Sequence, residues 1–420
     1  MEKYIGNKKK ILKEIGKIVD SLNVSHKSTF FDIFAGTNNV AKFFKNKGFK
    51  AITNDVNECS AIFARAIIEN DHVPSFRKVI NEYNLKIVCS DDLIEKFFLL
   101  NSNGYKYSWD DFKGTEKNLV YVLTFLSFVS DFKNILKKDK GFKVYPLIFN
   151  NYCPGGRKSA YKTQTGTKGK RMFFTNIHGK QIDLILNLLK YWKQKDIIST
   201  NEFNILLSTV VHAATLFSNT SGVYEAFYKK WFPNTQQSFR LPMPDLKTLR
   251  KPKGKSYCMD AIDLVDRFKK SVDILYIDPP YNTRQYDSNY HLLNTIAIFH
   301  KIDDLKDFEK KITGVRGQNS KRFYKSPFSS KKTFAEAMKK LVQNIDAKYV
   351  LVSYFDGNDN LWNEKGNKTG IKVLSTILSN KDYLKPKSLK IFKIPRQNFQ
   401  SRNGEKKKII NELVFCVEKK

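Results

Sequence analysis

The stretch that decides the fold is TFFDIFAGTNNVAKFFKNKGFKAITND, residues 29–55. Its pattern predicts a buried strand over 29–34, a glycine turn over 35–38, a helix over 40–47 that stops at Gly48, and a second strand over 49–55. A strand, a helix and a strand in this order form a βαβ unit, and such units build parallel, doubly wound sheets. The sequence therefore predicts an α/β fold.

The same rhythm is lost in the middle of the chain and returns near its end. Residues 8–22 and 59–69 have helical spacing, and residues 272–277, 348–354 and 412–417 are predicted strands. Between them lie helical patterns at 118–136, 182–192 and 202–214, and a turn-rich basic stretch at 150–171. We therefore predict a sheet domain split by an insertion, with a cofactor-binding part at 1–85, an inserted region at 86–250 and a second part of the sheet domain at 251–420.

The composition indicates a polyanionic partner. The chain has 420 residues, with 74 Lys and Arg against 41 Asp and Glu, a net charge of +33, and its 41% apolar residues exclude wholesale disorder. Nucleic acid is the simplest partner for so large an excess, although a Lys-rich composition typical of AT-rich genomes is the alternative.

Several classes of protein are not favoured by the sequence. No apolar run approaches the ~20 residues of a membrane helix, and the N-terminus lacks the apolar segment of a secretory signal. The five cysteines are scattered without a Cys-x-x-Cys pair, so that neither a disulfide framework nor a zinc site is indicated. We expect a reduced, cytoplasmic, metal-free protein that does not enter membranes.

The sharpest chemical motif is Asp278-Pro279-Pro280-Tyr281, directly after the apolar strand 272–277. The prolines lack amide hydrogens and fix the backbone, so neighbouring carbonyls can face a ligand. A carboxylate, a bare carbonyl and an aromatic face together suit an exocyclic amino group on a flat base. An ordinary turn is the alternative, but ligands bind at the carboxyl ends of strands in such sheets.

Two further features, the turn after the first strand and Asp55, indicate a nucleoside cofactor without phosphates. In the turn DIFAGTNNV, Gly36 permits close approach of a ligand and Asp32 can take an ammonium group. Asp55 follows at the spacing of an acidic residue that holds a ribose, with a helix cap as the alternative. Asp260 could accept from an adenine amino group, or could cap a helix.

Cations gather in three places among aromatic and small residues. They suit phosphate contacts and the clamping of a distorted DNA strand, with solvated charge as the alternative. The candidate DNA-binding residues are Arg157, Lys158, Lys168, Lys170, Arg171, Arg284, Arg316, Lys321 and Arg322.

Taken in order, these motifs resemble the Dam-like class of N6-adenine DNA methyltransferases, the alpha group, in a subgroup found in restriction–modification systems. KYIGNK at 3–8 resembles the family's N-terminal cofactor motif, and the segments NTRQY at 282–286 and YHLL at 290–293 resemble the subgroup. The family's turn usually has a second glycine where this chain has Asn38, and Asn tolerates a left-handed backbone.

The resemblance implies a Rossmann-like class I methyltransferase sheet with an inserted, mainly helical and loop target-recognition domain. It implies S-adenosyl-L-methionine as cofactor, double-stranded DNA as substrate and a cognate restriction endonuclease as a partner, in the cytoplasm of a bacterium or a phage-infected cell, at the nucleoid. The implied cofactor residues are Tyr4, Lys8, Asp32, Phe34, Gly36, Asp55, Asp260, Ala261 and Asp278.

The same resemblance implies a catalytic role for the motif at 278–281. Tyr281 would stack on a flipped adenine while Asp278 and the Pro279 carbonyl accept its amino hydrogens, with Pro280 fixing the backbone. The alternatives are an N4-cytosine methyltransferase, whose family usually has Ser at the Asp278 position, an RNA adenine methyltransferase, or a DNA-binding homologue without catalysis.

Overall fold

The structure is a computed structural model that describes residues 7–101, 107–128, 142–319, 324–357, 360–362, 364, 368–397 and 409–420. These residues form two compact units. The sheet unit contains the described residues before Arg65, those of Lys251–Asn289 and those of Tyr324–Lys420. The helical unit contains those of Arg65–Arg250 and Tyr290–Phe323. The units thus divide at 64/65 and 250/251, where the sequence predicts 85/86 and 250/251, and residues 290–323 join the helical unit.

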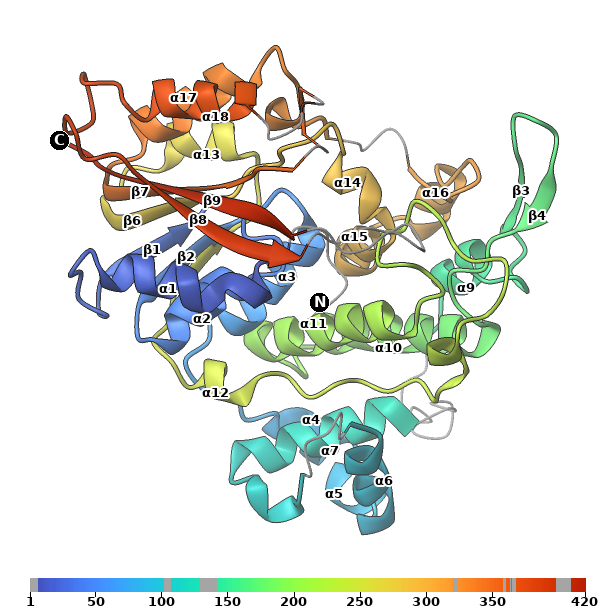
Figure 1. Ribbon diagram of the computed structural model, residues 1–420. Coiled ribbons are helices and arrows are strands. Elements are labelled where there is room, and N and C mark those ends of the chain that lie inside the picture. Colours follow the sequence, from blue (N-terminus) through green and yellow to red (C-terminus); the bar gives the residue numbers. More distant parts are fainter. Residues whose placement is uncertain are drawn as a thin grey trace. The chain divides into compact units, whose positions relative to one another are not determined.

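The sheet unit is built on a seven-stranded sheet, which confirms the predicted α/β fold (Figure 1). Its strand order is β5-β2-β1-β6-β7-β9-β8; the first five strands are parallel, and β9 is antiparallel to both β7 and β8. The strands are β1 (Thr29–Asp32), β2 (Lys50–Asn54), β5 (Lys255–Tyr257), β6 (Val272–Ile277), β7 (Ala347–Phe355), β8 (Lys390–Gln397) and β9 (Ile409–Glu418).

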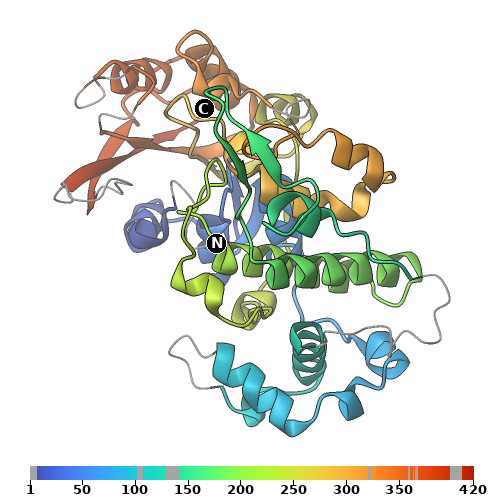
Figure 2. The ribbon, with the colours of Figure 1, turned by 90° about the vertical axis from the view of Figure 1, so that its right-hand side faces the viewer.

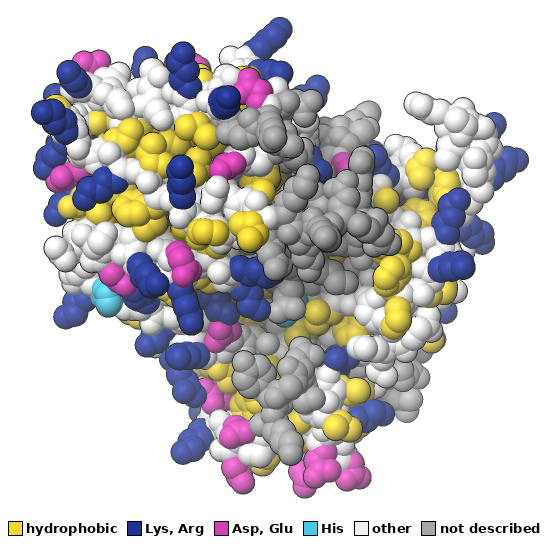
Figure 3. Space-filling model, viewed as in Figure 1, with side chains coloured by type: hydrophobic (Ala, Val, Ile, Leu, Met, Phe, Trp, Pro, Cys, Tyr) yellow, Lys and Arg dark blue, Asp and Glu magenta, His cyan; other side chains and the backbone are white. Residues whose placement is uncertain are grey.

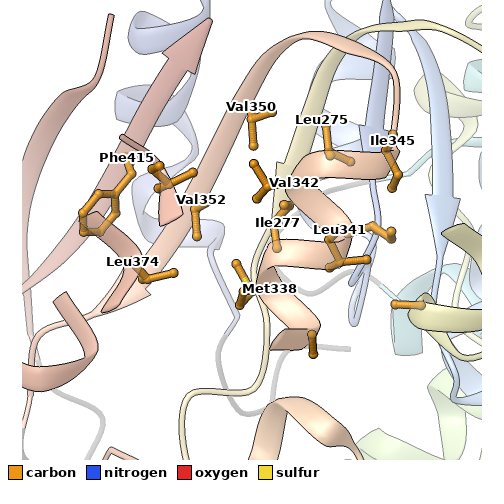
Figure 4. Close-up of a cluster of buried hydrophobic side chains, with 14 of the residues drawn as sticks. Leu275, Ile277, Met338, Leu341, Val342, Ile345, Val350, Val352, Leu374 and Phe415 are labelled. Carbon is orange, nitrogen blue, oxygen red and sulfur yellow. The ribbon is translucent and has the colours of Figure 1, made fainter. Parts of the chain in front are cut away.

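Helices cover both faces of this sheet because successive strand residues point to opposite sides. On one face, Phe30 and Ile274 pack with apolar residues of the N-terminal helices, and on the other Phe31 and Leu275 pack with those of the later helices (Figure 4). The helices are η1 (Lys9–Ile11), α1 (Leu12–Asp20), α2 (Asn39–Asn46), α3 (Glu58–Ile67), α13 (Ala261–Arg267), α14 (Tyr286–Asn289), η6 (Pro327–Ser329), α17 (Phe334–Asn344) and α18 (Lys368–Ile377).

The helical unit contains two groups of helices and a β-hairpin. The first group packs around α7, and the second around the long pair α10 and α11 (Figure 2). The first comprises α4 (Arg77–Glu82), α5 (Leu85–Val88), α6 (Asp91–Asn101), η2 (Trp109–Asp111) and α7 (Thr115–Phe128). The second comprises α9 (Leu147–Tyr152), α10 (Asn176–Gln194), α11 (Thr200–Phe217), η3 (Pro233–Gln236), α15 (His291–Ile298), η4 (Phe299–Lys301) and α16 (Leu305–Lys310). The short helix α12 (Leu246–Leu249) belongs to the same unit.

The basic stretch at 150–171, which the sequence predicts as turns, contains an antiparallel hairpin. Strands β3 (Ala160–Lys162) and β4 (Lys168–Lys170) pair through Tyr161 and Gly169, and the hairpin extends beyond the helices of its own unit (Figure 1). The predicted helix at 118–136 is described only as far as Phe128, within α7. Within the described ranges, no helix combines the length and apolar character needed to cross a bilayer.

The turn after β1 keeps its shape without the second glycine. Asn38 adopts a left-handed backbone, with φ of 60°, directly before α2. Its side-chain amide donates to the carbonyl of Ser60 at 3.0 Å, and its backbone N–H donates to the carbonyl of Ala35 at 2.6 Å. Asn is among the few residues that tolerate this backbone, so it replaces glycine here.

Replacing Asn38 tests that reading. Because a residue without a polar side chain pays about 1–2 kcal/mol for this backbone conformation, Asn38→Ala should unfold at lower denaturant concentration than Asn38→Gly. Both variants lose the bond to Ser60, so that their difference isolates the backbone cost. Equal stability of the two variants in chemical denaturation would contradict this account.

Candidate active site

An open pocket lies in the sheet unit at the carboxyl ends of the central parallel strands. Residues from the ends of β1, β2 and β6, and from the turns that follow them, line it together. Ten of the predicted site residues in the described part of the chain line it. They are Lys8, Asp32, Phe34, Gly36, Asp55, Ala261, Asp278, Pro279, Pro280 and Tyr281.

Asp55, directly after β2, holds the glycine turn that follows the neighbouring strand β1. Its Oδ2 accepts the backbone N–H of Gly36 at 2.7 Å, and its Oδ1 accepts the N–H of Asn57 at 2.8 Å. Burial raises the pKa of the Asp55 carboxyl, and these two amides lower it. The carboxylate therefore ties the end of β2 to the turn after β1, on the wall of the pocket.

Asp32 is a buried acid at the end of β1 with unused bonding capacity. Its side chain is 2% exposed, and its Oδ1 has no hydrogen-bond partner in the described part of the chain. Burial raises the pKa of this carboxyl well above its usual range, and the charges of Asp278 and Asp55 raise it further. A cationic group bound in the pocket would satisfy this oxygen and hold Asp32 in its ionised form.

Asp278 follows β6 and is held by a lysine from the N-terminal segment. Lys8 Nζ lies 2.8 Å from Asp278 Oδ1 and 3.0 Å from an oxygen of Glu412 on β9. The lysine is 4% exposed, and although burial lowers its pKa, the two carboxylates outweigh burial and raise it well above the ordinary value. Lys8 is therefore a buried ammonium shared by two acids.

Tyr281 stands beside this ion pair with one face already covered. Its ring stacks on Phe355 of β7, with centroids 5.0 Å apart and planes 20° from parallel. Its backbone carbonyl accepts the N–H of Leu361 at 2.9 Å, and Lys8 Nζ lies 5.7 Å from its ring centroid. These contacts fix the orientation of the aromatic ring next to the Asp278 carboxylate.

Asp260 is a helix cap in this structure. Its Oδ1 accepts the backbone N–H of Ile262 at 2.6 Å at the start of α13, and Tyr324 bonds to the same carboxyl group. The pocket lining on that side comes from its neighbours Met259 and Ala261. Of the two roles that the sequence allows for Asp260, the structure supports the cap.

The candidate DNA-binding residues fall into different environments. Arg171 is 3% exposed, and its guanidinium donates to the carbonyls of Asn151, Lys158, Gly314 and Val315 at 2.6–3.2 Å. These bonds commit its donors to the backbone, so Arg171 supports the loops around the hairpin in place of the DNA contact that the sequence predicts.

The other basic candidates are more accessible. Lys168 and Lys170 on β4 are exposed, as is Arg284 after the Asp278 motif. Arg157 and Lys158 pair with the buried Glu309, and the exposed Arg316 pairs with Glu225. Tyr4, Lys321 and Arg322 lie outside the described residues.

The buried acids Glu309 and Glu412 are both missing from the sequence-based prediction. Glu309 of α16 accepts from Tyr145 and Asn150 and pairs with Lys158, and so anchors the segment before the hairpin. Glu412 is 0% exposed and directly precedes the buried apolar residues 413–417 of β9. A lone acid in a buried strand was the available signal for Glu412, because such a charge must be paired.

Comparisons with known proteins show the family of this chain. Residues 4–353 match the family model described as D12 class N6 adenine-specific DNA methyltransferase, and the chain belongs to that family. It is 29% identical over 420 residues to the Modification methylase StsI of Streptococcus sanguinis, covering 100% of this chain and 52% of that protein.

Two further relatives are similar to this chain. The Type II methyltransferase M.FokI of Planomicrobium okeanokoites is 28% identical over 417 residues, which cover 99% of this chain and 52% of that protein. The Type II methyltransferase M.NlaIII of Neisseria lactamica is 33% identical over 211 residues, covering 50% of this chain and 55% of that protein. The chain spans about half the length of the curated relatives StsI and M.FokI.

Removal of the shared lysine should make stability strongly dependent on pH. In Lys8→Met, Asp278 loses the cation that lowers its pKa, so that pKa, which burial already raises to about 6, rises further above its value in the unfolded chain, whereas Glu412 keeps Arg396 as a partner. Stability is then lost as pH rises through the raised pKa of Asp278, and we expect a cost of about 3–5 kcal/mol at pH 8 and less at pH 5.

Thermal unfolding at both pH values measures this effect. The matched control is Lys10→Met, which removes an exposed lysine of η1 and should unfold like the parent protein at both values. An equal loss of stability at pH 5 and pH 8 in Lys8→Met would contradict the shared-lysine arrangement.

Proposed function

We propose that this chain transfers a methyl group from S-adenosyl-L-methionine to the exocyclic N6 amino group of an adenine flipped out of double-stranded DNA. The observation that carries the proposal is the placement of Asp278 and Tyr281 on the same pocket as Gly36 and Asp55. The Asp278 carboxylate and the Tyr281 ring suit a flat base. They lie next to the Gly36 turn and the Asp55 carboxylate, which suit a nucleoside. Family membership supports the same chemistry.

The residues of the pocket fit S-adenosylmethionine. The unsatisfied Oδ1 of Asp32 suits its ammonium group, and the Asp55 carboxylate beside Gly36 suits its ribose. Phe34 and Ala261 add apolar surface to the lining. When bound, the cofactor supplies an electrophilic methyl group on a sulfonium centre. We keep Tyr4 as a further proposed contact on the strength of the sequence resemblance.

Asp278 and Tyr281 hold and orient the target base. Because Lys8 engages Oδ1 of Asp278, we assign Oδ2 and the Pro279 carbonyl to the two amino hydrogens of adenine. The face of the Tyr281 ring away from Phe355 is assigned to the base. Two fixed acceptors favour a pyramidal amino nitrogen with its lone pair directed at the methyl carbon, a case of preorganisation.

We assign recognition of the DNA to the helical unit and its β-hairpin. Residues 160–170 contain three lysines and no acid, and Lys168 and Lys170 are exposed on β4. The dark blue side chains of this hairpin stand out in Figure 3. The other proposed contacts are Arg157, Lys158 and Arg316 of the helical unit, Arg284 of the sheet unit, and Lys321 and Arg322. By contrast, residues 65–128 contain eight Lys and Arg against nine Asp and Glu.

The biological setting follows from the relatives. Their names describe modification and type II methyltransferases, which supports a role for this chain in protecting DNA within a restriction–modification system. We propose a cognate restriction endonuclease as partner, and the bacterial or phage-infected cytoplasm, at the nucleoid, as the place of action.

Loss of the catalytic carboxylate should abolish methyl transfer. In Asp278→Ala the amino group loses an acceptor, and we expect transfer of tritiated methyl groups to unmethylated phage DNA to fall by roughly 10²–10⁴-fold. Affinity for DNA should change little, because the proposed phosphate contacts remain.

Asp263→Ala is the matched control, since Asp263 is an exposed acid on α13 and lies outside the pocket lining. Near-normal transfer by Asp278→Ala would refute the assignment. A parent protein that binds DNA but transfers no methyl group would support the non-catalytic alternative.

Binding to DNA should weaken steeply with salt, because each phosphate contact releases counterions. In the Lys168→Ala/Lys170→Ala variant, the slope of log affinity against log salt concentration should decrease by about 2, roughly 1 for each lost phosphate contact. Lys86→Ala on α5 is the control, because that lysine lies in the charge-balanced region. An unchanged slope in the double variant would exclude the hairpin from the DNA interface.

A further inference from the structure

Glu412 is a buried charge that the proposed chemistry does not use directly. Its Oε1 accepts from Ser353 Oγ at 2.7 Å and lies 3.0 Å from Lys8 Nζ, and its Oε2 lies 2.8 Å from Arg396 Nε. Lys8 and Asp278 line the pocket, whereas Glu412 stands behind them, outside the lining. Among the described residues, the lining residue with which Glu412 forms an ion pair is Lys8, and its charge also acts on Asp278.

Four charged side chains form a continuous chain of ion pairs at this place. Arg396 pairs with Glu412, Glu412 with Lys8, and Lys8 with Asp278, so two cations alternate with two anions. Burying such a row is costly, and apolar residues would stabilise a strand core at least as well. The following residues of β9, from Leu413 to Val417, are indeed apolar and buried. A functional role for the buried Glu412 therefore depends on its effect on Lys8.

We propose that Glu412 is a positioning residue for methyl transfer, which holds Lys8 between two carboxylates and thereby leaves Asp278 able to accept the proton released by the methylated amino group. This inference rests on the proposed function. Without Glu412, Lys8 would pair with Asp278 alone and would hold that carboxylate as a stable anion.

Glu412 acts on the step in which the methylated amino group loses its extra proton. The lone pair of the adenine amino nitrogen forms the bond to the methyl carbon, while the carbon–sulfur bond breaks and its electron pair stays on sulfur. The nitrogen then carries a positive charge and one proton too many. Asp278 Oδ2 takes that proton and becomes neutral, and it later releases the proton to solvent. While Asp278 is neutral, Glu412 remains as the counter-ion of Lys8.

The electrostatics of the site agree with this role. Burial raises the pKa of Asp278 to about 6, with Lys8 lowering it and Glu412 raising it. For Glu412 burial also raises the pKa, but Lys8 and Arg396 outweigh burial and the value is lowered, so that Glu412 stays ionised. The other groups that act on or are acted on by Asp278 are Arg396 of β8, Tyr276 of β6, Tyr281 and Asp32.

The test is the pH profile of single-turnover methyl transfer by the full chain, with saturating S-adenosylmethionine and unmethylated phage DNA. The rate of the parent protein should fall below about pH 6, where Asp278 protonates. In Glu412→Gln a raising influence on the pKa of Asp278 is lost, so the acid limb should move to lower pH. The plateau rate should fall about 10-fold because Asp278 is a weaker base. KM for the cofactor should stay within about twofold, since Glu412 lies outside the pocket lining.

Two further variants, Arg396→Gln and Glu412→Asp, test the direction in which the acid limb moves. Arg396 lowers the pKa of Asp278, so Arg396→Gln should move the acid limb to higher pH, the opposite direction from Glu412→Gln. Glu412→Asp keeps the charge and should return the limb toward that of the parent protein. Glu418→Gln is the matched control, because Glu418 lies on the same strand and pairs with Lys385.

The outcomes separate this inference from the proposed function. An unmoved acid limb in both Glu412→Gln and Arg396→Gln, whether or not the rate falls, would overturn the positioning role and leave the methyltransferase function standing. If Glu412→Gln fails to fold, the direction of the shift in Arg396→Gln decides. A parent protein that transfers no methyl group would overturn both.

Discussion

The ion pair between Lys8 and Asp278 is the interaction on which the site depends. It joins the segment before α1 to the end of β6, and it neutralises an acid that burial would otherwise protonate. Glu412 on the other side of Lys8 keeps the lysine from belonging to Asp278 alone. In the reaction that we propose, this arrangement lets the Asp278 carboxylate both accept hydrogen bonds and take up a proton.

The parallel sheet explains why these groups meet. β1 lies between β2 and β6, and the three strands are parallel. Their carboxyl ends therefore bring Asp32, Asp55 and Asp278 to one edge of the sheet. Three acids at one edge repel each other, and the structure relieves this with backbone amides at Asp55 and with Lys8 at Asp278. Asp32 keeps an unsatisfied oxygen, which is the feature most suited to a cationic ligand.

Local patterns predicted much of the fold and part of the site. The βαβ unit, the strand before Asp278 and the long helices α10 and α11 follow from periodicity over neighbouring residues. Arg171 and Glu412 did not follow, because their roles depend on partners far away in the chain. Arg171 binds carbonyls more than 140 positions further on, at 314 and 315, and Glu412 meets a lysine at the opposite end of the chain. From neighbouring residues alone, a charged side chain is predicted to be exposed. The distant partners that allow Arg171 and Glu412 to be buried become visible only in the folded chain.

The most direct test of the central claim is to identify the product. Duplex DNA would be incubated with the purified chain and S-adenosylmethionine bearing a trideuterated methyl group, and its nucleosides would be separated and weighed by mass spectrometry. The account predicts the heavy methyl group on the N6 of deoxyadenosine. Label on the N4 of deoxycytidine, or unlabelled nucleosides from a folded and DNA-binding protein, would contradict it.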